Sequence, residues 1–134
     1  MEQKKIVCDS DVMIDYWDAK NPRYDLVTSI LQDRIGLSNV VLSAITKMEL
    51  LLGATNKNDL ARINKELAPF NISLINNVIC QKALSLIQKY SLSHGLTLPD
   101  SLIASTAIIT GTNLFTYNTK HYKFISDLTL YDPA

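Results

Sequence analysis

The chain has 134 residues, 47% hydrophobic and 19% charged, a composition typical of one globular domain over residues 1–134 and unlike that of disordered or fibrous proteins. Thirteen Lys and Arg balance 13 Asp and Glu, so no overall positive field attracts nucleic acid or anionic lipid. No apolar run approaches the roughly 18 to 20 residues of a membrane span, and the first residues do not resemble a signal peptide, so we expect neither a transmembrane segment nor a signal peptide.

The first half of the chain alternates between short β-branched runs and helical patterns. Residues 5–8 predict a buried strand, and the apolar spacing after it predicts a helix that begins near Asp11. A second helix is predicted over residues 24–33. Residues 40–43 predict the second strand, and a helical stripe from Ile45 to Leu52 follows it directly.

The second half repeats this alternation, with helices predicted over residues 58–67, 78–92 and 99–111, and strands over residues 72–75, 114–117 and 128–131. Strands separated by helical segments predict right-handed crossovers and a mainly parallel sheet. We therefore expect a three-layer α/β/α domain with four or five strands. In such sheets, functional residues gather beyond the carboxyl ends of the strands.

The two cysteines, Cys8 and Cys80, lie in apolar segments and have no metal-ligand spacing. We expect both to be small buried side chains in a reducing compartment, and we therefore expect a cytoplasmic protein.

Three acidic residues belong to elements that flank the expected carboxyl edge of the sheet. Asp9 ends the first strand, Glu49 lies at the border of an apolar helical stripe, and Asp100 follows Pro99 in the first turn of an apolar helix. Each has an ordinary explanation, because Asp9 and Asp100 can cap or complement a helix N-terminus and Glu49 can point into water. Together, three carboxylates without matching bases predict a site for a hard cation such as Mg²⁺ or Mn²⁺.

The sequence lacks the motifs of several other classes of catalytic or binding site. The chain has no glycine-rich dinucleotide or P-loop motif and no G-x-S-x-G elbow, and His94 and His121 do not have the spacing of zinc ligands. The tripeptide Asp9-Ser10-Asp11 is similar to the aspartyl-phosphate motif of haloacid-dehalogenase-like phosphatases, in which Asp9 would be a nucleophile. That family's later paired aspartates have no counterpart here.

Four segments together resemble the PIN-domain ribonucleases, and among them the VapC-type toxins of toxin-antitoxin pairs. The segments are residues 8–15, 42–54, 100–107 and 114–122, and they occur in the family's order along the whole chain. The resemblance implies a PIN-like domain and a Mg²⁺- or Mn²⁺-dependent endoribonuclease. Asp9, Glu49 and Asp100 would hold the metal.

The resemblance also implies roles for neighbouring residues. The family often has a fourth acid where this chain has Asn118 or His121, and these neutral groups bind a hard cation more weakly. Thr116 and Asn118, and likewise Ser10 and Ser43, would orient water or a carboxylate. The expected reaction is in-line hydrolysis of a phosphodiester, with Asp100 as the candidate general base.

RNA binding would use cations near this edge, and the candidates are Lys47, Lys120 and Lys123, unless these are simply solvated lysines. Tyr117, Tyr122 and Phe124 can offer stacking faces to unpaired bases or pack in the core. The resemblance further implies a homodimer and a cognate antitoxin that covers the catalytic groove. A catalytically inactive PIN-like module that binds RNA or protein is the alternative.

Overall fold

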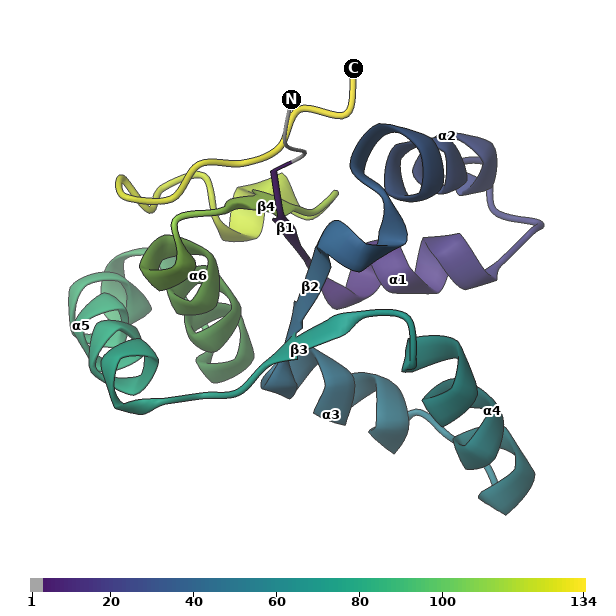
Figure 1. Ribbon diagram of the computed structural model, residues 1–134. Helices are drawn as coiled ribbons and strands as arrows, with labels where there is room; N and C mark the ends of the chain where they lie inside the picture. The colour runs from purple at the N-terminus through teal and green to yellow at the C-terminus, as the bar shows by residue number, and fades with distance from the viewer. Residues whose placement is uncertain (1–3) are drawn as a thin grey trace.

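A four-stranded parallel sheet lies between two layers of helices in the computed structural model, which describes residues 4–134 (Figure 1). The strands are β1 (Ile6–Cys8), β2 (Val40–Ser43), β3 (Asn71–Ser73) and β4 (Asn113–Phe115), in the spatial order β3-β2-β1-β4. The α-helices are α1 (Ser10–Trp17), α2 (Tyr24–Thr28), α3 (Ala44–Leu52), α4 (Lys57–Leu67), α5 (Asn77–His94) and α6 (Leu98–Thr110). The predicted three-layer α/β/α class is confirmed.

The register of the two central strand pairs aligns their ends. Ile6 at the start of β1 is paired with Val40 of β2 and with Asn113 of β4, and Cys8 at its end is paired with Phe115. Because all four strands are parallel, the residues that follow them emerge at one edge of the sheet, which we call the carboxyl edge. The residues that precede them lie at the opposite, amino edge.

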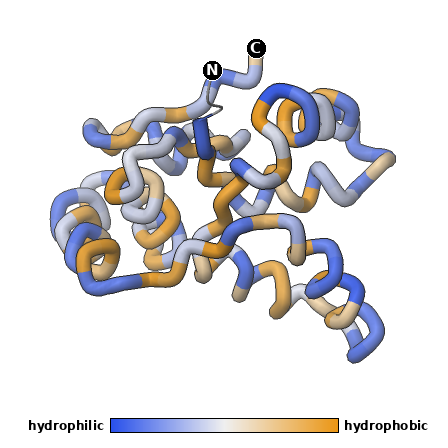
Figure 2. The backbone as a smooth tube through the Cα atoms, in the orientation of Figure 1, coloured by the Kyte–Doolittle hydropathy of each residue, from blue (hydrophilic) through white to orange (hydrophobic). Residues whose placement is uncertain are grey.

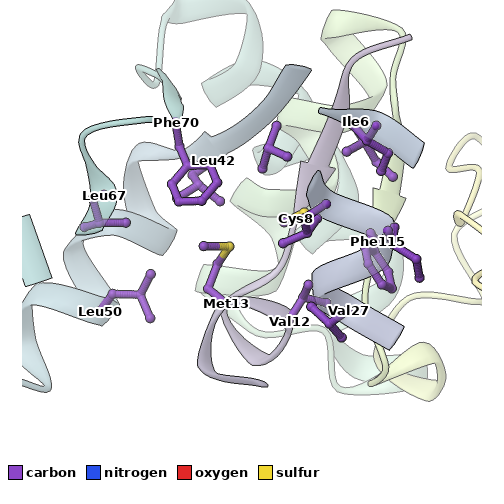
Figure 3. Packing of buried hydrophobic residues seen from close by; sticks show 14 of the residues in the cluster. Ile6, Cys8, Val12, Met13, Val27, Leu42, Leu50, Leu67, Phe70 and Phe115 are labelled. Atoms are coloured by element: carbon purple, nitrogen blue, oxygen red, sulfur yellow. The ribbon is translucent and has the colours of Figure 1, made fainter. Parts of the chain in front are cut away.

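Side chains alternate between the two faces of the sheet and build a separate apolar core on each. On one face, Ile6 and Cys8 pack with α1, α2 and α4 in a cluster that contains Val12, Met13 and Phe115 (Figure 3). On the other face, the core is formed by β1, β2 and β4 with α5 and α6. This double burial explains why β1 and β2 are mainly apolar runs, which lie in the orange centre of the molecule in Figure 2.

Two helices end at glycines in the left-handed conformation. Gly95 and Gly111 both have φ of 68°, and their N–H groups donate to carbonyl oxygens of the last turn of α5 and α6. His94 is therefore the last residue of α5, as its position before Gly95 indicates. None of the helices among residues 4–134 is long and apolar enough to cross a membrane.

The prediction of a strand over residues 128–131 is wrong, because this segment forms only an isolated bridge. Only Leu130 forms a bridge, to Leu114, and two backbone hydrogen bonds flank it, from Leu114 N–H to Thr129 and from Tyr131 N–H to Leu114. The backbone of this segment therefore meets β4 at one point and does not form a fifth strand.

The predicted burial of Cys80 is also wrong, whereas Cys8 is buried in β1 as expected. Helix α5 directs Ile79 and Ala83 into the core, and the next residue after Ile79 is rotated by about 100° toward solvent. The other departures are shifts of element ends. The third strand covers Asn71–Ser73, and the second helix continues from α2 as a π-helix over Ser29–Ile35.

Candidate metal centre

Asp9 lies directly after β1 at the carboxyl edge and caps helix α1. Its backbone is extended, with φ of −75° and ψ of 162°, and its Oδ1 accepts the Ser10 N–H at 2.8 Å. Its Oδ2 accepts the hydroxyl of Thr116, which follows β4, at 2.9 Å. The Asp9 side chain is only 5% exposed, and this burial raises the pKa of its carboxyl, which the bonds from Ser10 and Thr116 lower.

The Tyr122 hydroxyl joins Asp9 to Asp100. It lies 3.1 Å from Oδ2 of Asp9 and 2.9 Å from Oδ1 of Asp100, which is in the first turn of α6. Burial and the charges of both carboxylates raise the pKa of this hydroxyl, so it remains protonated at neutral pH. A single phenolic proton can be donated to only one acceptor at a time. The two carboxylates are therefore held close together with one proton between them.

Glu49 is the exposed member of the predicted triad. It lies on α3, which begins after Ser43 at the end of β2, and its side chain is at the surface. Partial desolvation raises the pKa of its carboxyl, and the negative charges of Asp9 and Asp100 raise it further. The three acids therefore share one electrostatic environment.

Asp11 is a fourth acid at this edge, and our sequence interpretation gave it no role there. Its Oδ2 accepts the Tyr117 N–H at 2.9 Å, and its Oδ1 lies 3.4 Å from the Thr116 hydroxyl. Asp11 thus fixes the turn after β4 that brings Thr116 to Asp9. The sequence signal was its place two residues after Asp9, on the first turn of the predicted helix.

The remaining candidate residues have different surroundings. Ser43 is buried and caps α3, its Oγ accepting the Ile45 N–H at 3.3 Å, while the Ser10 Oγ lies 3.5 Å from Asp9. Asn118 is exposed, and its N–H donates to the Thr116 Oγ1 at 3.0 Å. The His121 Nδ1 lies 3.5 Å from Oδ2 of Asp100. Of these four residues, Ser10 and His121 contact the acids directly.

The proposed RNA-contacting side chains differ in access. Lys120 and Lys123 are exposed and Lys47 is half-buried, and none forms an ion pair with another residue in the described chain. Tyr122 is fully buried, so its ring cannot stack on a base. The Tyr117 ring is partly buried under the Arg23 guanidinium, which lies 4.2 Å from its centroid.

The donor set has the chemistry that a hard cation requires. Asp9, Asp11, Glu49 and Asp100 form no ion pair with any described Lys or Arg. Across residues 4–134, no three His, Cys, Asp or Glu side chains are yet arranged to hold a metal ion together. Of the three predicted ligands, Asp9 and Asp100 already lie close together, at the Tyr122 hydroxyl. Glu49, being exposed, can change rotamer to complete the set, so the three-carboxylate site stays a prediction.

Replacing Tyr122 by Phe tests the hydroxyl bridge. We expect Tyr122→Phe to lower the free energy of unfolding by about 1–2 kcal/mol in EDTA, because Asp9 and Asp100 both lose a hydrogen-bond partner in a buried site. Urea denaturation measures this. Tyr24→Phe, at a half-buried tyrosine on α2, is the matched control and should change the value by less than about 0.5 kcal/mol. Equal losses in both variants would contradict the bridge.

Comparisons with known proteins agree with this geometry. The family model described as PIN domain matches residues 6–125, which includes Asp9, Glu49, Asp100 and the turn after β4. No curated protein sequence matches the chain.

Several solved structures have the same fold. A toxin-antitoxin complex from Klebsiella pneumoniae has a chain 25% identical to this one, with a TM-score of 0.76, covering 97% of this chain and 98% of that chain. FitAcB from Neisseria gonorrhoeae is also 25% identical, with a TM-score of 0.76 and coverage of 96% and 97%. DNA-bound VapBC from Salmonella typhimurium is 20% identical, with a TM-score of 0.75 and coverage of 98% and 100%. The resemblance found in the sequence is therefore confirmed.

Proposed function

Because this chain belongs to the PIN-domain family, we propose that it is the toxin of a toxin-antitoxin pair and acts as a Mg²⁺- or Mn²⁺-dependent endoribonuclease. The observation that carries the proposal is the pair Asp9 and Asp100, held at one Tyr122 hydroxyl beside Glu49 and without a Lys or Arg partner among the described residues. Two close carboxylates repel each other unless a cation or proton lies between them. The family match favours this over a phosphatase in which Asp9 is a nucleophile.

Asp9, Glu49 and Asp100 would hold the ion. When bound, Mg²⁺ or Mn²⁺ polarises water and neutralises negative charge on the phosphate oxygens. Thr116 and the Ser10 N–H keep the Asp9 carboxylate in one orientation, because each donates to a different oxygen of it.

In this proposal Asp100 accepts the proton of the attacking water. The Oδ1 of Asp100 accepts the Tyr122 hydroxyl, so Oδ2 is the oxygen that would accept this proton. The Asp100 side chain is 20% exposed, which gives water access to it. The His121 Nδ1 at 3.5 Å from this Oδ2 can hold the carboxylate in place or share the proton. In the hydrolysis, the water oxygen bonds to phosphorus, the bond from phosphorus to the leaving sugar oxygen breaks, and that oxygen takes up a proton.

A neighbouring structure supports an antitoxin as a proposed partner of this chain. The Klebsiella pneumoniae structure is a toxin-antitoxin complex, and by analogy an antitoxin would bind this chain and cover the carboxylates. A homodimer and a cytoplasmic location complete the proposal, together with RNA contacts by Lys47, Lys120 and Lys123.

Cleavage of RNA by the purified chain tests the function. Single-stranded and structured RNAs are incubated with Mg²⁺ or Mn²⁺, with EDTA, and with an Asp100→Asn variant. We expect cleavage that requires the ion and is lost in the variant. Equal cleavage by variant and parent would indicate a contaminating nuclease. No cleavage by a folded, ion-loaded parent would favour the inactive PIN-like module, a possibility raised by Asn118 and His121 at the positions of the fourth acid.

A further inference from the structure

A second polar site lies at the amino edge of the sheet, on the side away from the carboxylates. A groove of about 1340 Å³ there is lined by Lys4, Lys5, Arg34, Thr112, Asn113 and Tyr131, among others. We call it the amino-edge groove. In Figure 1 the yellow C-terminal segment crosses this end of the molecule, beside the start of β1.

Cations precede β1 and β2 at the amino edge, and acids follow these two strands at the carboxyl edge. Lys4 and Lys5 precede β1 and Asp9 follows it, so the groove and the carboxylates are about 13 Å apart at strand spacing. Arg34 lies before β2, whereas Glu49 lies after it.

The three cations of the groove are available to an anion. Lys4, Lys5 and Arg34 are exposed, and none forms an ion pair within residues 4–134. The Arg34 Nη1 donates to the Pro133 carbonyl oxygen at 3.2 Å, which holds the guanidinium at the groove and leaves it further N–H donors for an anion. Like charges gathered in one groove repel each other unless an anion is bound between them.

The groove suits an extended polyanion better than a small ligand. Its donors come from the segments before β2, β1 and β4, and adjacent strands are about 4.8 Å apart, so cations and polar groups follow one another across the edge. Lys and Arg together with Thr and Asn side chains are the usual contacts of phosphate and sugar groups.

We propose that the amino-edge groove binds the phosphate backbone of single-stranded RNA, at a site separate from the carboxylate cluster. The choice of RNA rests on the proposed function, whereas the preference for a polyanion rests on the charges alone. An RNA strand that contacts both edges would be held around the sheet rather than at the carboxylates only.

Binding of a fluorescent single-stranded RNA, followed by anisotropy in EDTA over a range of salt concentrations, tests the groove. Lys4→Gln with Lys5→Gln removes two cations from it, and Lys57→Gln with Lys65→Gln on α4 is the matched control. We expect the groove variant to bind roughly tenfold more weakly and to lower the salt slope of the binding constant by about 1.4, since each phosphate contact on a single strand contributes about 0.7. The control should change neither.

A second variant and a second ligand complete the test. Arg34→Gln should weaken binding in the same direction, since it removes the third cation of the groove. Equal affinities of the groove and control variants would overturn the proposal, as would stronger binding of polyglutamate than of RNA. Cleavage with Mn²⁺ is measured separately. Loss of binding in the groove variants without cleavage by the parent would refute only the proposed nuclease, and cleavage with unchanged binding would refute only the groove.

Discussion

Asp9→Asn is expected to lower the rate of RNA cleavage by at least about 100-fold. Asp9 is the most buried of the three acids, and the Tyr122 hydroxyl contacts both Asp9 and Asp100. The amide of the variant carries no negative charge, so it binds a hard cation more weakly than the carboxylate does. A loss of 100-fold corresponds to about 2.7 kcal/mol of transition-state stabilisation, which lies within the several kcal/mol that a catalytic metal supplies. Initial rates with a defined RNA at saturating Mn²⁺ measure the effect.

The variant should fold, which makes the loss of activity interpretable. Asn is as good an N-cap as Asp, so the bond from the Ser10 N–H that begins α1 is kept. The matched control is Asp33→Asn, the same chemical change at an exposed residue of the π-helix, and it should retain the parent's rate. A folded Asp9→Asn protein that cleaves within a few fold of the parent would contradict the assignment.

Binding of Mn²⁺ or Mg²⁺ is expected to stabilise the folded chain strongly. An ion that binds only the folded state at 100 times its Kd adds about 2.7 kcal/mol, which for a chain of this length raises Tm by roughly 10 °C. Thermal unfolding with Mn²⁺ and with EDTA measures the shift. The shift should disappear in Asp9→Asn and persist in Asp33→Asn. A parent protein whose Tm is the same in both buffers would count against the metal site.

The same shift should depend on pH in a defined direction. The pKa values of Asp9 and Glu49 are raised in the folded state, so the metal-free protein holds these protons more tightly than the unfolded chain does. These groups therefore stabilise the metal-free fold below the ordinary carboxyl pKa, and that contribution is lost as the pH rises through the raised values. Since the ion binds the deprotonated acids, the Mn²⁺ shift should be larger at pH 7 than near pH 4.5. A larger shift at the acid pH would contradict this.

The role of the buried hydroxyls distinguishes this site from one built of acids alone. Thr116 and Tyr122 both donate toward Oδ2 of Asp9, and Asp11 holds the turn that carries Thr116. These contacts join the segment after β4 to the segment after β1, more than 100 positions apart in the sequence. The turn after β4 therefore contributes to the site through hydroxyl groups, although it has no fourth acid.

The chain's own local patterns determined the order of strands and helices and the place of Asp9. A β-branched run that stops at an acid, followed by helical spacing, defines a strand end and a helix start without reference to distant residues. Asp100 was placed in the same way, by Pro99 at the start of an apolar helix.

Only the tertiary structure decided which side chains meet. The sequence offered Tyr122 as core or as a stacking face, and its fully buried hydroxyl between Asp9 and Asp100 depends on the packing of the segment after β4 against β1 and α6. The exposure of Cys80 and the single bridge at Leu130 were likewise settled by partners far along the chain. Periodicity reports which face of an element is apolar, whereas hydrogen bonds and strand pairing also depend on the residues that the fold brings opposite it.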